Sequence, residues 1–415
     1  MMPGKTLAAL CPTALLLLCL LIRPAPLHAQ IPIRASVPDG NVNIFNTDMA
    51  VLETADVRKD LPCSVTPVQP TVGFDLRFHA GYDVNLPLRE LAGGDNLLTV
   101  VFRITMDDRK QAPVYFAQHI RVPEIPENPK GDAWLQGSFE VGEGTYHVDW
   151  LMRDRSERVC SFYWDSTAAV PAKDRPMELA IAPGVIQRES PEQFHEEAPV
   201  QRAPESPLNV KVLVNFAPQR SLAPRMEPVD TVALVSILRS ISRDPRIGKF
   251  SLVAFNMQEE RVLYRQERAD RIDFPALGKA LTSLNLGTID LKRLGEKHGD
   301  TAFLCDLIHR EVPIGGIEHP DALIFAGPKV MLDSNVSQDS LRDVAGVDYP
   351  VFYMNYNLNP VAIPWRDAIS HTVKFLRGYE YTISKPKDLW HSVSDMVSRI
   401  VKSRNERQSA AISSQ

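Results

Sequence analysis

Short apolar runs alternate with helical patterns over the second half of the chain, from residue 208 to residue 404. The first run, residues 209–216 (NVKVLVNF), has the length and the apolar character of a buried strand. In the next stretch, residues 229–242, the apolar positions recur at helical spacing. This alternation predicts an open, doubly wound α/β sheet, in which ligands bind at the carboxyl ends of the strands.

The remaining elements of this half follow the same pattern. Residues 249–256 and 261–266 are separated by four residues and predict an antiparallel hairpin. The other predicted strands are residues 321–326 and 350–355, and the other predicted helices are residues 274–284, 302–311, 363–377 and 387–402. The order of strands and helices is that of an α/β domain.

The first half shows the alternation of strands and no helical spacing. The strand patterns, separated by polar turns, are residues 73–88 (one or two strands), 96–105, 113–122, 134–141, 145–153 and 158–164. Several short strands at this spacing predict an antiparallel β-sandwich. We therefore expect an α+β protein with more than one domain.

Two groups of side chains on the predicted sandwich have both a functional and an ordinary interpretation. His147 and Asp149 point to the same side of one strand and would hold a metal ion together, but a metal site needs three or four ligands and no third is local. Trp150, Phe162 and Trp164 would form a platform for a sugar ring or fill the core. We favour a solvated strand face for the first group and the core for the second.

The N-terminus has the parts of a secretory signal peptide. Lys5 precedes an apolar run over residues 14–22, and a small residue stands at a cleavage point after residue 29. The run is shorter than the ~20 residues of a membrane span, and no later run reaches that length. We therefore expect residues 1–29 to be removed and the chain to be exported, periplasmic or extracellular, with no integral membrane segment.

A stretch rich in proline and glutamate separates the two halves. Residues 188–207 (RESPEQFHEEAPVQRAPESP) bury too little apolar surface to offset the entropy of ordering, so they predict an extended linker. The linker divides the mature chain into a sandwich domain, residues 30–187, and an α/β domain, residues 208–404. The polar tail, residues 405–415, is expected to be disordered.

Charge and cysteine content narrow the class of protein. A net charge of -5 argues against a nucleic-acid-binding protein, which normally has a basic face. Two of the five cysteines lie in the signal peptide. Cys63 and Cys160 bracket the sandwich and predict a disulfide in an oxidising compartment. Cys305, in an apolar helical run, is expected to be a buried small side chain.

The end of the strand at residues 209–216 carries a family resemblance. In the von Willebrand factor A family the first strand runs into Asp-x-Ser-x-Ser, which binds a divalent metal ion. The matching positions here are Asn215, Ala217 and Gln219. The α/β half therefore resembles a von Willebrand A domain in its order of elements, and the resemblance implies a metal-binding edge that has lost its aspartate and serines.

Two further segments resemble the same family. Residues 299–304 (GDTAFL) are similar to its Gly-Gly-Thr segment, which places Thr301 at the metal-loop threonine, and Gly327 stands where an aspartate follows a later strand. A hard divalent ion needs several oxygen ligands, usually including a carboxylate. We therefore expect no metal and no cofactor, and a helix-capping role for Thr301. The Gly-x-Tyr-x-x-x-Trp pattern from Gly144 to Trp150 resembles immunoglobulin-like modules.

No catalytic motif is present in the sequence, which has no Gly-x-Ser-x-Gly, phosphate-binding glycine loop, His-Glu-x-x-His or Cys-x-x-Cys. We therefore predict an exported, non-catalytic protein-interaction or adhesion-type protein whose partner is a protein. The alternative is a hydrolase or carbohydrate-active protein with a site assembled from distant residues. A cleft joining polar side chains from several loops would favour the alternative, whereas backbone partners for Asn215 and Gln219 would favour the interaction protein.

Overall fold

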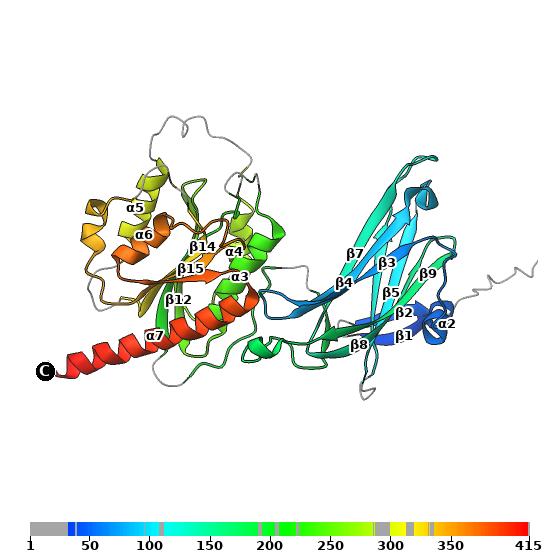
Figure 1. Ribbon diagram of the computed structural model, residues 1–415, viewed down its shortest axis with the longest axis horizontal. Helices are drawn as coiled ribbons and strands as arrows, with labels where there is room; N and C mark the ends of the chain where they lie inside the picture. The colour runs from blue at the N-terminus through cyan, green and yellow to red at the C-terminus, as the bar shows by residue number, and fades with distance from the viewer. Residues whose placement is uncertain are drawn as a thin grey trace, which may run out of the picture. The chain divides into compact units, whose positions relative to one another are not determined.

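The computed structural model describes residues 32–37, 40–94, 96–107, 112–189, 193–203, 207–220, 223, 225–284, 286, 299–312, 319–330, 332 and 336–413 (Figure 1). The chain divides into two compact units, one comprising Met1–Val65, Val84–Trp134 and His147–Asp165, the other Thr66–Asp83, Leu135–Tyr146 and Ser166–Gln415. The fold is α+β, with antiparallel sheets and one mixed sheet. The predicted signal peptide lies outside the described residues, and the domain boundaries at residues 187 and 208 stay a prediction.

The first half of the chain forms two four-stranded sheets and a two-stranded one. One sheet has the order β10 (Ile186–Arg188), β7 (Asp132–Val141), β4 (Phe78–Pro87) and β3 (Ser64–Val72). Another has the order β6 (Val114–Arg121), β5 (Leu97–Met106), β8 (Gly144–Arg153) and β9 (Val159–Ala168), and β1 (Pro32–Val37) pairs with β2 (Gly40–Phe45). The pairings β1–β2, β5–β6 and β7–β10 are antiparallel. Every strand predicted in this half is present.

A short helix, α2 (Asn46–Thr54), lies where the sequence predicts no helix. Leu52 is its one fully buried apolar residue, which is too little to produce a helical pattern. Charged contacts fix the helix instead. Asp48 forms an ion pair with Arg153 (Oδ1 to Nε, 3.2 Å), and Arg103 donates a hydrogen bond to the backbone oxygen of Leu52 at 3.1 Å.

The aromatic side chains of β8 and β9 belong to the core. Trp150 and Tyr146 are fully buried, and Trp164 is nearly so. Phe162 is half-buried, and its ring centroid lies 6.0 Å from that of Trp164. The core interpretation is therefore confirmed for Trp150 and Trp164, whereas Phe162 is only partly buried.

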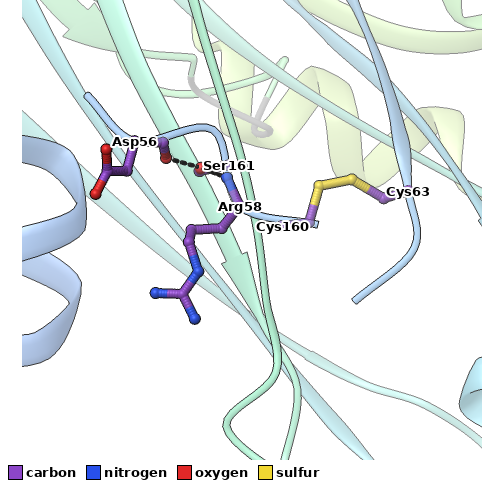
Figure 2. Close-up of a disulfide and its surroundings, with 5 residues drawn as sticks. All are labelled: Asp56, Arg58, Cys63, Cys160 and Ser161. Atoms are coloured by element: carbon purple, nitrogen blue, oxygen red, sulfur yellow. Dashed lines mark hydrogen bonds between the residues drawn. A yellow bond between two sulfur atoms is a disulfide. The ribbon is translucent and has the colours of Figure 1, made fainter. Parts of the chain in front are cut away.

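Cys63 and Cys160 form a disulfide whose Cα atoms are 6.3 Å apart (Figure 2). The bond joins the segment before β3 to the start of β9, and hydrogen bonds to Ser161 hold the same segment there. Ser161 Oγ accepts from the backbone N of Arg58 at 2.8 Å and donates to the backbone oxygen of Asp56 at 2.6 Å. The predicted disulfide is confirmed.

The second half contains a six-stranded sheet with helices on both faces. Its order is β13 (Arg261–Ala269), β12 (Ile247–Asn256), β11 (Leu208–Asn215), β14 (Ala322–Pro328), β15 (Val351–Tyr356) and β16 (Tyr379–Ile383). The β12–β13 hairpin is antiparallel, and every other pairing in this sheet is parallel. This is the doubly wound topology that the sequence predicts.

Two apolar cores lie on opposite faces of this sheet. The helices α3 (Pro228–Arg243), α4 (Phe274–Leu281) and α7 (Pro386–Ser413) contribute to one core, and α5 (Gly299–Glu311) and α6 (Ala368–Phe375) contribute to the other. Adjacent residues of β11, Val212 and Leu213, belong to different cores. Because both faces of the strand are buried, its sequence is a continuous apolar run.

Two expectations for this half are wrong. The sequence analysis did not predict β16, because its residues alternate between polar and aromatic and only Ile383 is fully buried. The disordered tail predicted for residues 405–415 is helical as far as Ser413, where α7 ends. Good helix formers such as Arg407 and Ala410 continue the helix without an apolar stripe.

The described part of the predicted linker, residues 193–203, lies along α3. Glu197 pairs with Arg239 and with Arg243, in both cases at 2.7 Å. Arg202 donates to the backbone oxygens of Ser242 (2.9 Å) and Asp244 (3.0 Å). Composition alone does not reveal this attachment, because the partners are arginines and carbonyls of a distant helix. None of the helices among the described residues is long and apolar enough to cross a membrane.

Candidate functional site

Asparagine side chains form hydrogen bonds with the loop backbone at the carboxyl edge of the six-stranded sheet. Asn215, the last residue of β11, is 1% exposed, and its Oδ1 accepts a hydrogen bond from the backbone N of Met257 at 3.1 Å. Asn256, the last residue of β12, donates to the backbone oxygen of Phe216 (2.6 Å) and accepts from the backbone N of Glu259 (2.7 Å). Both amides therefore serve the loop backbone.

Gly327 fills the position where the resemblance places an aspartate. Its φ is +149°, a conformation that residues with a side chain rarely adopt. A Cβ on this residue would lie 2.8 Å from Asn215 Cβ and 3.1 Å from Asn215 O. The two strands approach too closely for any side chain here, so the geometry excludes a carboxylate at this position.

The other three positions of the resemblance differ in their surroundings. Ala217 is buried, and its backbone N donates to Asn215 O at 3.0 Å. Gln219 has a buried Nε2 without a partner among the described residues. Thr301 lies in the first turn of α5, and its backbone N donates to Asp300 Oδ1 at 2.6 Å. The structure thus joins Asn215 to Ala217 and Gly327, and it assigns Thr301 to the start of a helix.

One carboxylate does approach this edge. Asp230, in the first turn of α3, is 3% exposed, and burial raises its pKa although hydrogen bonds from the backbone N–H groups of Glu227 and Gln219 and from Tyr356 oppose the rise. It forms a capping box with Glu227. Its oxygens are committed to the start of the helix, where Oδ2 accepts from the backbone N of Glu227 at 3.4 Å.

Apolar side chains are exposed around the same edge. Val361 and Trp365, in the loop after β15, are 93% and 50% exposed, and Val229 at the start of α3 is 41% exposed. A cavity of about 580 Å³ beside the end of β11 is lined mainly by apolar side chains, which include Phe194, Phe216, Met226, Leu281, Leu284 and Leu286. The edge offers apolar contact area and no described group of free carboxylates.

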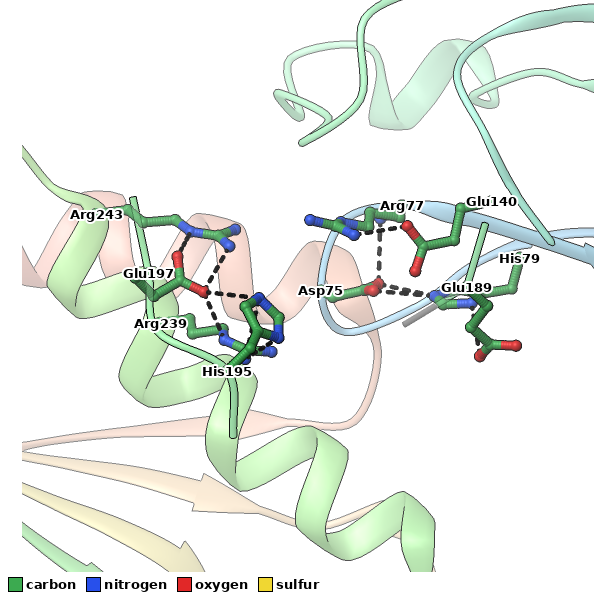
Figure 3. A network of polar contacts seen from close by, with 9 residues as sticks. All are labelled: Asp75, Arg77, His79, Glu140, Glu189, His195, Glu197, Arg239 and Arg243. Carbon is green, nitrogen blue, oxygen red and sulfur yellow. Dashed lines mark hydrogen bonds and ion pairs between the residues drawn. The ribbon is translucent and has the colours of Figure 1, made fainter. Parts of the chain in front are cut away.

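A polar cluster that the sequence analysis did not identify lies at the turn between β3 and β4 (Figure 3). His79 Nε2 is 3.0 Å from Asp75 Oδ1, and His79 Nδ1 is 3.5 Å from Glu189 Oε1. Arg77 donates to Glu140 Oε2 at 2.6 Å. Ligand atoms of Asp75, His79 and Glu140 all lie within 4.8 Å of one another, the spacing of potential metal ligands.

The electrostatics of this cluster follow from burial and from close opposite charges. Burial alone would lower the pKa of His79, but hydrogen bonds to Asp75 and Glu189 raise it to about 10. Burial raises the pKa of Glu140 in spite of Arg77. Burial would also raise the pKa of Asp75, but the hydrogen bond with His79 lowers it. In the absence of another cation, His79 is therefore an imidazolium at neutral pH.

The turn that carries the cluster is tightly built. Gly73 N donates to Arg77 O at 2.8 Å, and Leu76 has a φ of 61°. A Cβ on Gly73 would lie 2.7 Å from both Asp75 Oδ1 and His79 Nε2. Glycine therefore leaves the space in which the carboxylate and the imidazole meet. A cavity of about 160 Å³ in the same unit is lined by these side chains and by residues of α3.

His147 and Asp149 gain a third polar neighbour that is distant in sequence. His147 Nδ1 is 2.6 Å from Asp165 Oδ1, and His147 Nε2 is 3.3 Å from Asp149 Oδ1. Asp149 is also tied to Arg103 at 2.7 Å. Asp165 is exposed and His147 is partly exposed, but Asp149 is buried, so the expectation of a solvated strand face is wrong for Asp149.

Cys305 on α5 is half-buried and unpaired, so the expectation of full burial is corrected. It packs beside the core that α5 and α6 line, and burial raises the pKa of its thiol.

No family model and no curated protein matches the chain. Among solved structures, the minor pilin PilB from Streptococcus sanguinis aligns with a TM-score of 0.27 at 6% identity, covering 73% of this chain and 87% of the pilin. A glycosyl hydrolase family 2 member from Bacteroides cellulosilyticus aligns with a TM-score of 0.19 at 13% identity, covering 78% of this chain and 39% of the hydrolase. These scores are too low to support an argument about fold or function.

Proposed function

We propose that the chain is an exported, non-catalytic protein that binds another protein through the carboxyl edge of its six-stranded sheet. In this proposal the sheet belongs to a von Willebrand A-like domain, preceded by an immunoglobulin-like sandwich. The observation that carries it is the contact of Gly327 with Asn215, which leaves no room for a metal-binding carboxylate at the strand ends. The doubly wound sheet and the disulfide support it as well.

Apolar exposure at the same edge supports a protein as the partner. Val361 and Trp365 lie on a loop that follows a strand end, and exposed large apolar side chains are typical of protein interfaces. The partner would cover these side chains, since the edge offers no described cluster of charges for an ionic ligand.

A carbohydrate-active function is the second candidate, favoured by a different cavity. This cavity of about 510 Å³ is lined by Tyr381, Trp390 and His391 together with acidic side chains, and its volume suits a small ligand. Its carboxylates are already engaged. Glu380 accepts from Asn355 and Ser370, and Asp388 accepts from the backbone at the start of α7. An acid–base pair for hydrolysis needs carboxylates that are available to the substrate, so we prefer the interaction function.

Site-specific photo-cross-linking tests the interaction function. A photoreactive residue at Val361 or Trp365 should give one protein adduct in the exported fraction of the source cells, whereas the same residue at Val68, 39% exposed on β3, should not. The identified protein should bind the purified chain, and Val361→Asp should weaken binding while Val68→Asp should not. Equal adducts at all three positions, or none, would count against the proposed function.

A further inference from the structure

We propose that Asp75, His79 and Glu140 bind one divalent transition-metal ion such as Zn²⁺, with Glu189 as the carboxylate that orients His79 through its other ring nitrogen. Its ligands are not residues of the carboxyl edge of the six-stranded sheet, so this inference does not rest on the proposed interaction function. All four residues lie in one compact unit of the chain, on the turn before β4, on β4, on β7 and just after β10.

The geometry places three potential ligand groups around one point and a fourth carboxylate on the far side of the imidazole ring. The ring nitrogens of His79 face Asp75 on one side (Nε2 to Oδ1, 3.0 Å) and Glu189 on the other (Nδ1 to Oε1, 3.5 Å). Asp75, His79 and Glu140 form a set whose ligand atoms lie within 4.8 Å of one another, and Glu189 can hold the ring from its Nδ1 side. Ligands at about 2.0–2.2 Å from a tetrahedral Zn²⁺ are separated by distances in this range, so small side-chain movements suffice.

The surrounding backbone keeps these side chains in place. The β3–β4 turn is closed by the bond from Gly73 N to Arg77 O, and the backbone N of Arg77 also donates to Asp75 Oδ1 at 3.2 Å. Glu140 is 3% exposed and projects from a paired strand. Ligands on such fixed elements are preorganised, which lowers the entropic cost of binding an ion.

Space limits the ligand to an ion or a very small molecule. The adjoining cavity has a volume of about 160 Å³, whereas small-molecule pockets usually span about 300–1,000 Å³. The three carboxylates and the imidazole converge beside this cavity. An ion would replace the direct contact between His79 and Asp75. Because Gly73 has no side chain, these two side chains have room to move apart.

The charge of the cluster also suits a divalent cation. Three carboxylates, of Asp75, Glu140 and Glu189, share one guanidinium, that of Arg77, which pairs with Glu140 at 2.6 Å. With a neutral imidazole, two negative charges remain, and a divalent ion balances them. The combination of one imidazole with carboxylates favours Zn²⁺ or Mn²⁺ over Ca²⁺ and Mg²⁺, which prefer oxygen ligands alone.

Three arginine side chains and the proton on His79 oppose binding and must be outweighed. Arg77 competes for Glu140, and Arg239 and Arg243 of α3 line the same cavity. Figure 3 shows the α3 arginines engaged with Glu197, as a cluster distinct from the one around Asp75. Removal of Arg77 therefore distinguishes a pure ion-pair network from a metal site. In an ion-pair network Glu140 loses its cation. In a metal site the same removal frees the Glu140 carboxylate to bind the ion.

Calorimetric titration of the full chain with ZnCl₂ at pH 7.5 tests the proposal. We expect one saturable site per chain, and loss of a ligand in His79→Gln or Glu140→Gln should weaken binding by more than the about tenfold that an outer contact costs. Glu140→Gln can keep its hydrogen bond with Arg77, so it tests the charge without removing the contact. Arg77→Gln should bind Zn²⁺ more tightly than the unmodified chain.

The matched control is His147→Gln, which alters another histidine flanked by two carboxylates, Asp149 and Asp165. It should leave the isotherm unchanged. Circular dichroism of each metal-free variant establishes that it is folded. The proposal is overturned by the absence of a saturable isotherm, by an isotherm that His79→Gln leaves intact, by one that His147→Gln removes, or by weaker binding in Arg77→Gln.

Discussion

At the end of β14, the backbone of Gly327 has a φ of +149° and passes within van der Waals contact of Asn215. An alanine here would meet both an unfavourable backbone conformation and a Cβ contact of 2.8 Å. We therefore expect Gly327→Ala to lower the free energy of unfolding by about 2–4 kcal/mol. Urea denaturation followed by circular dichroism measures the change.

Gly94→Ala is the control for that substitution, because no atom lies within 4 Å of the Cβ that it adds. It should change the free energy of unfolding by no more than about 0.5 kcal/mol. If Gly327→Ala is as stable as the unmodified chain, the strand end has room for a side chain, and the steric argument for a metal-free edge fails.

The raised pKa of His79 makes the stability of the metal-free chain depend on pH. Because the folded-state pKa is about 10 and the ordinary value is 6.5, the contribution of the imidazolium is complete below pH 6.5 and is lost as the pH rises through about 10. The difference in Tm between the unmodified chain and His79→Gln, measured with EDTA, should therefore shrink between pH 6.5 and 10. A difference that stays constant over this range would show that His79 is not held in its charged form.

The sequence predicted the residues of the strand ends better than the polar cluster. Asn215 and Gly327 follow apolar runs, so their place at the carboxyl edge could be inferred from pattern alone. Asp75 and His79 lie four residues apart in a stretch that reads as strand, and the turn depends on a positive φ at Leu76, a residue type that gives no turn signal. Glu140 comes from another strand altogether, and pairing in space cannot be read from one sequence.

At the scale of elements, the strength of the apolar pattern decided what could be predicted. The predicted strands and helices of the α/β half are present because each buries a continuous or periodic apolar face. The edge strand β16 and the last turns of α7 bury few side chains, so their sequences resemble loops. Short α2 was missed because charged contacts rather than an apolar stripe fix it.

The attachment of the linker to α3 gives a second stability prediction. Glu197 is mostly buried, accepts hydrogen bonds from Arg243 and forms an ion pair with Arg239, and these contacts lower its pKa although burial opposes them. Glu197→Ala would leave two guanidinium groups without this partner. It should lower the free energy of unfolding by about 1–3 kcal/mol. Urea denaturation of the unmodified chain and of Glu197→Ala measures the difference in the free energy of unfolding.

The neighbouring Glu196 provides the control. It is 60% exposed in its side chain and pairs with Arg271, which is 64% exposed. Glu196→Ala should change the free energy of unfolding by less than about 1 kcal/mol, as surface ion pairs do. Equal effects of the two substitutions would mean that the segment is not held on the helix by Glu197.

At the scale of the whole molecule, the Cys63–Cys160 disulfide constrains the unfolded chain, because the two residues are 97 positions apart. Replacing both with alanine should lower the free energy of unfolding by about 3–5 kcal/mol in the chain-entropy model. Cys305→Ala, which removes a half-buried free thiol, should cost less. Comparable losses in the two variants would show that the disulfide adds nothing beyond the packing of its sulfur atoms.

The sequence indicated a linker and two fold types, but it did not indicate how the chain divides into compact units. The compact units divide β4 between them and include the segment around Glu197 with α3. Such partition depends on contacts between distant residues, which charge and hydropathy patterns do not encode. The fold class is therefore predictable from the sequence, whereas the organisation of the units is not.

The central claim is that the carboxyl edge of the sheet binds no divalent metal ion and contacts a protein instead. Titration with Mg²⁺ and Mn²⁺ of the chain that carries both His79→Gln and Glu140→Gln, which together disable the other candidate site, tests the absence of a metal ion most directly. The account predicts no saturable heat at millimolar ion and no effect of adding Thr301→Ala. A one-to-one isotherm that disappears with Thr301→Ala would place a metal ion at the strand ends and contradict the account.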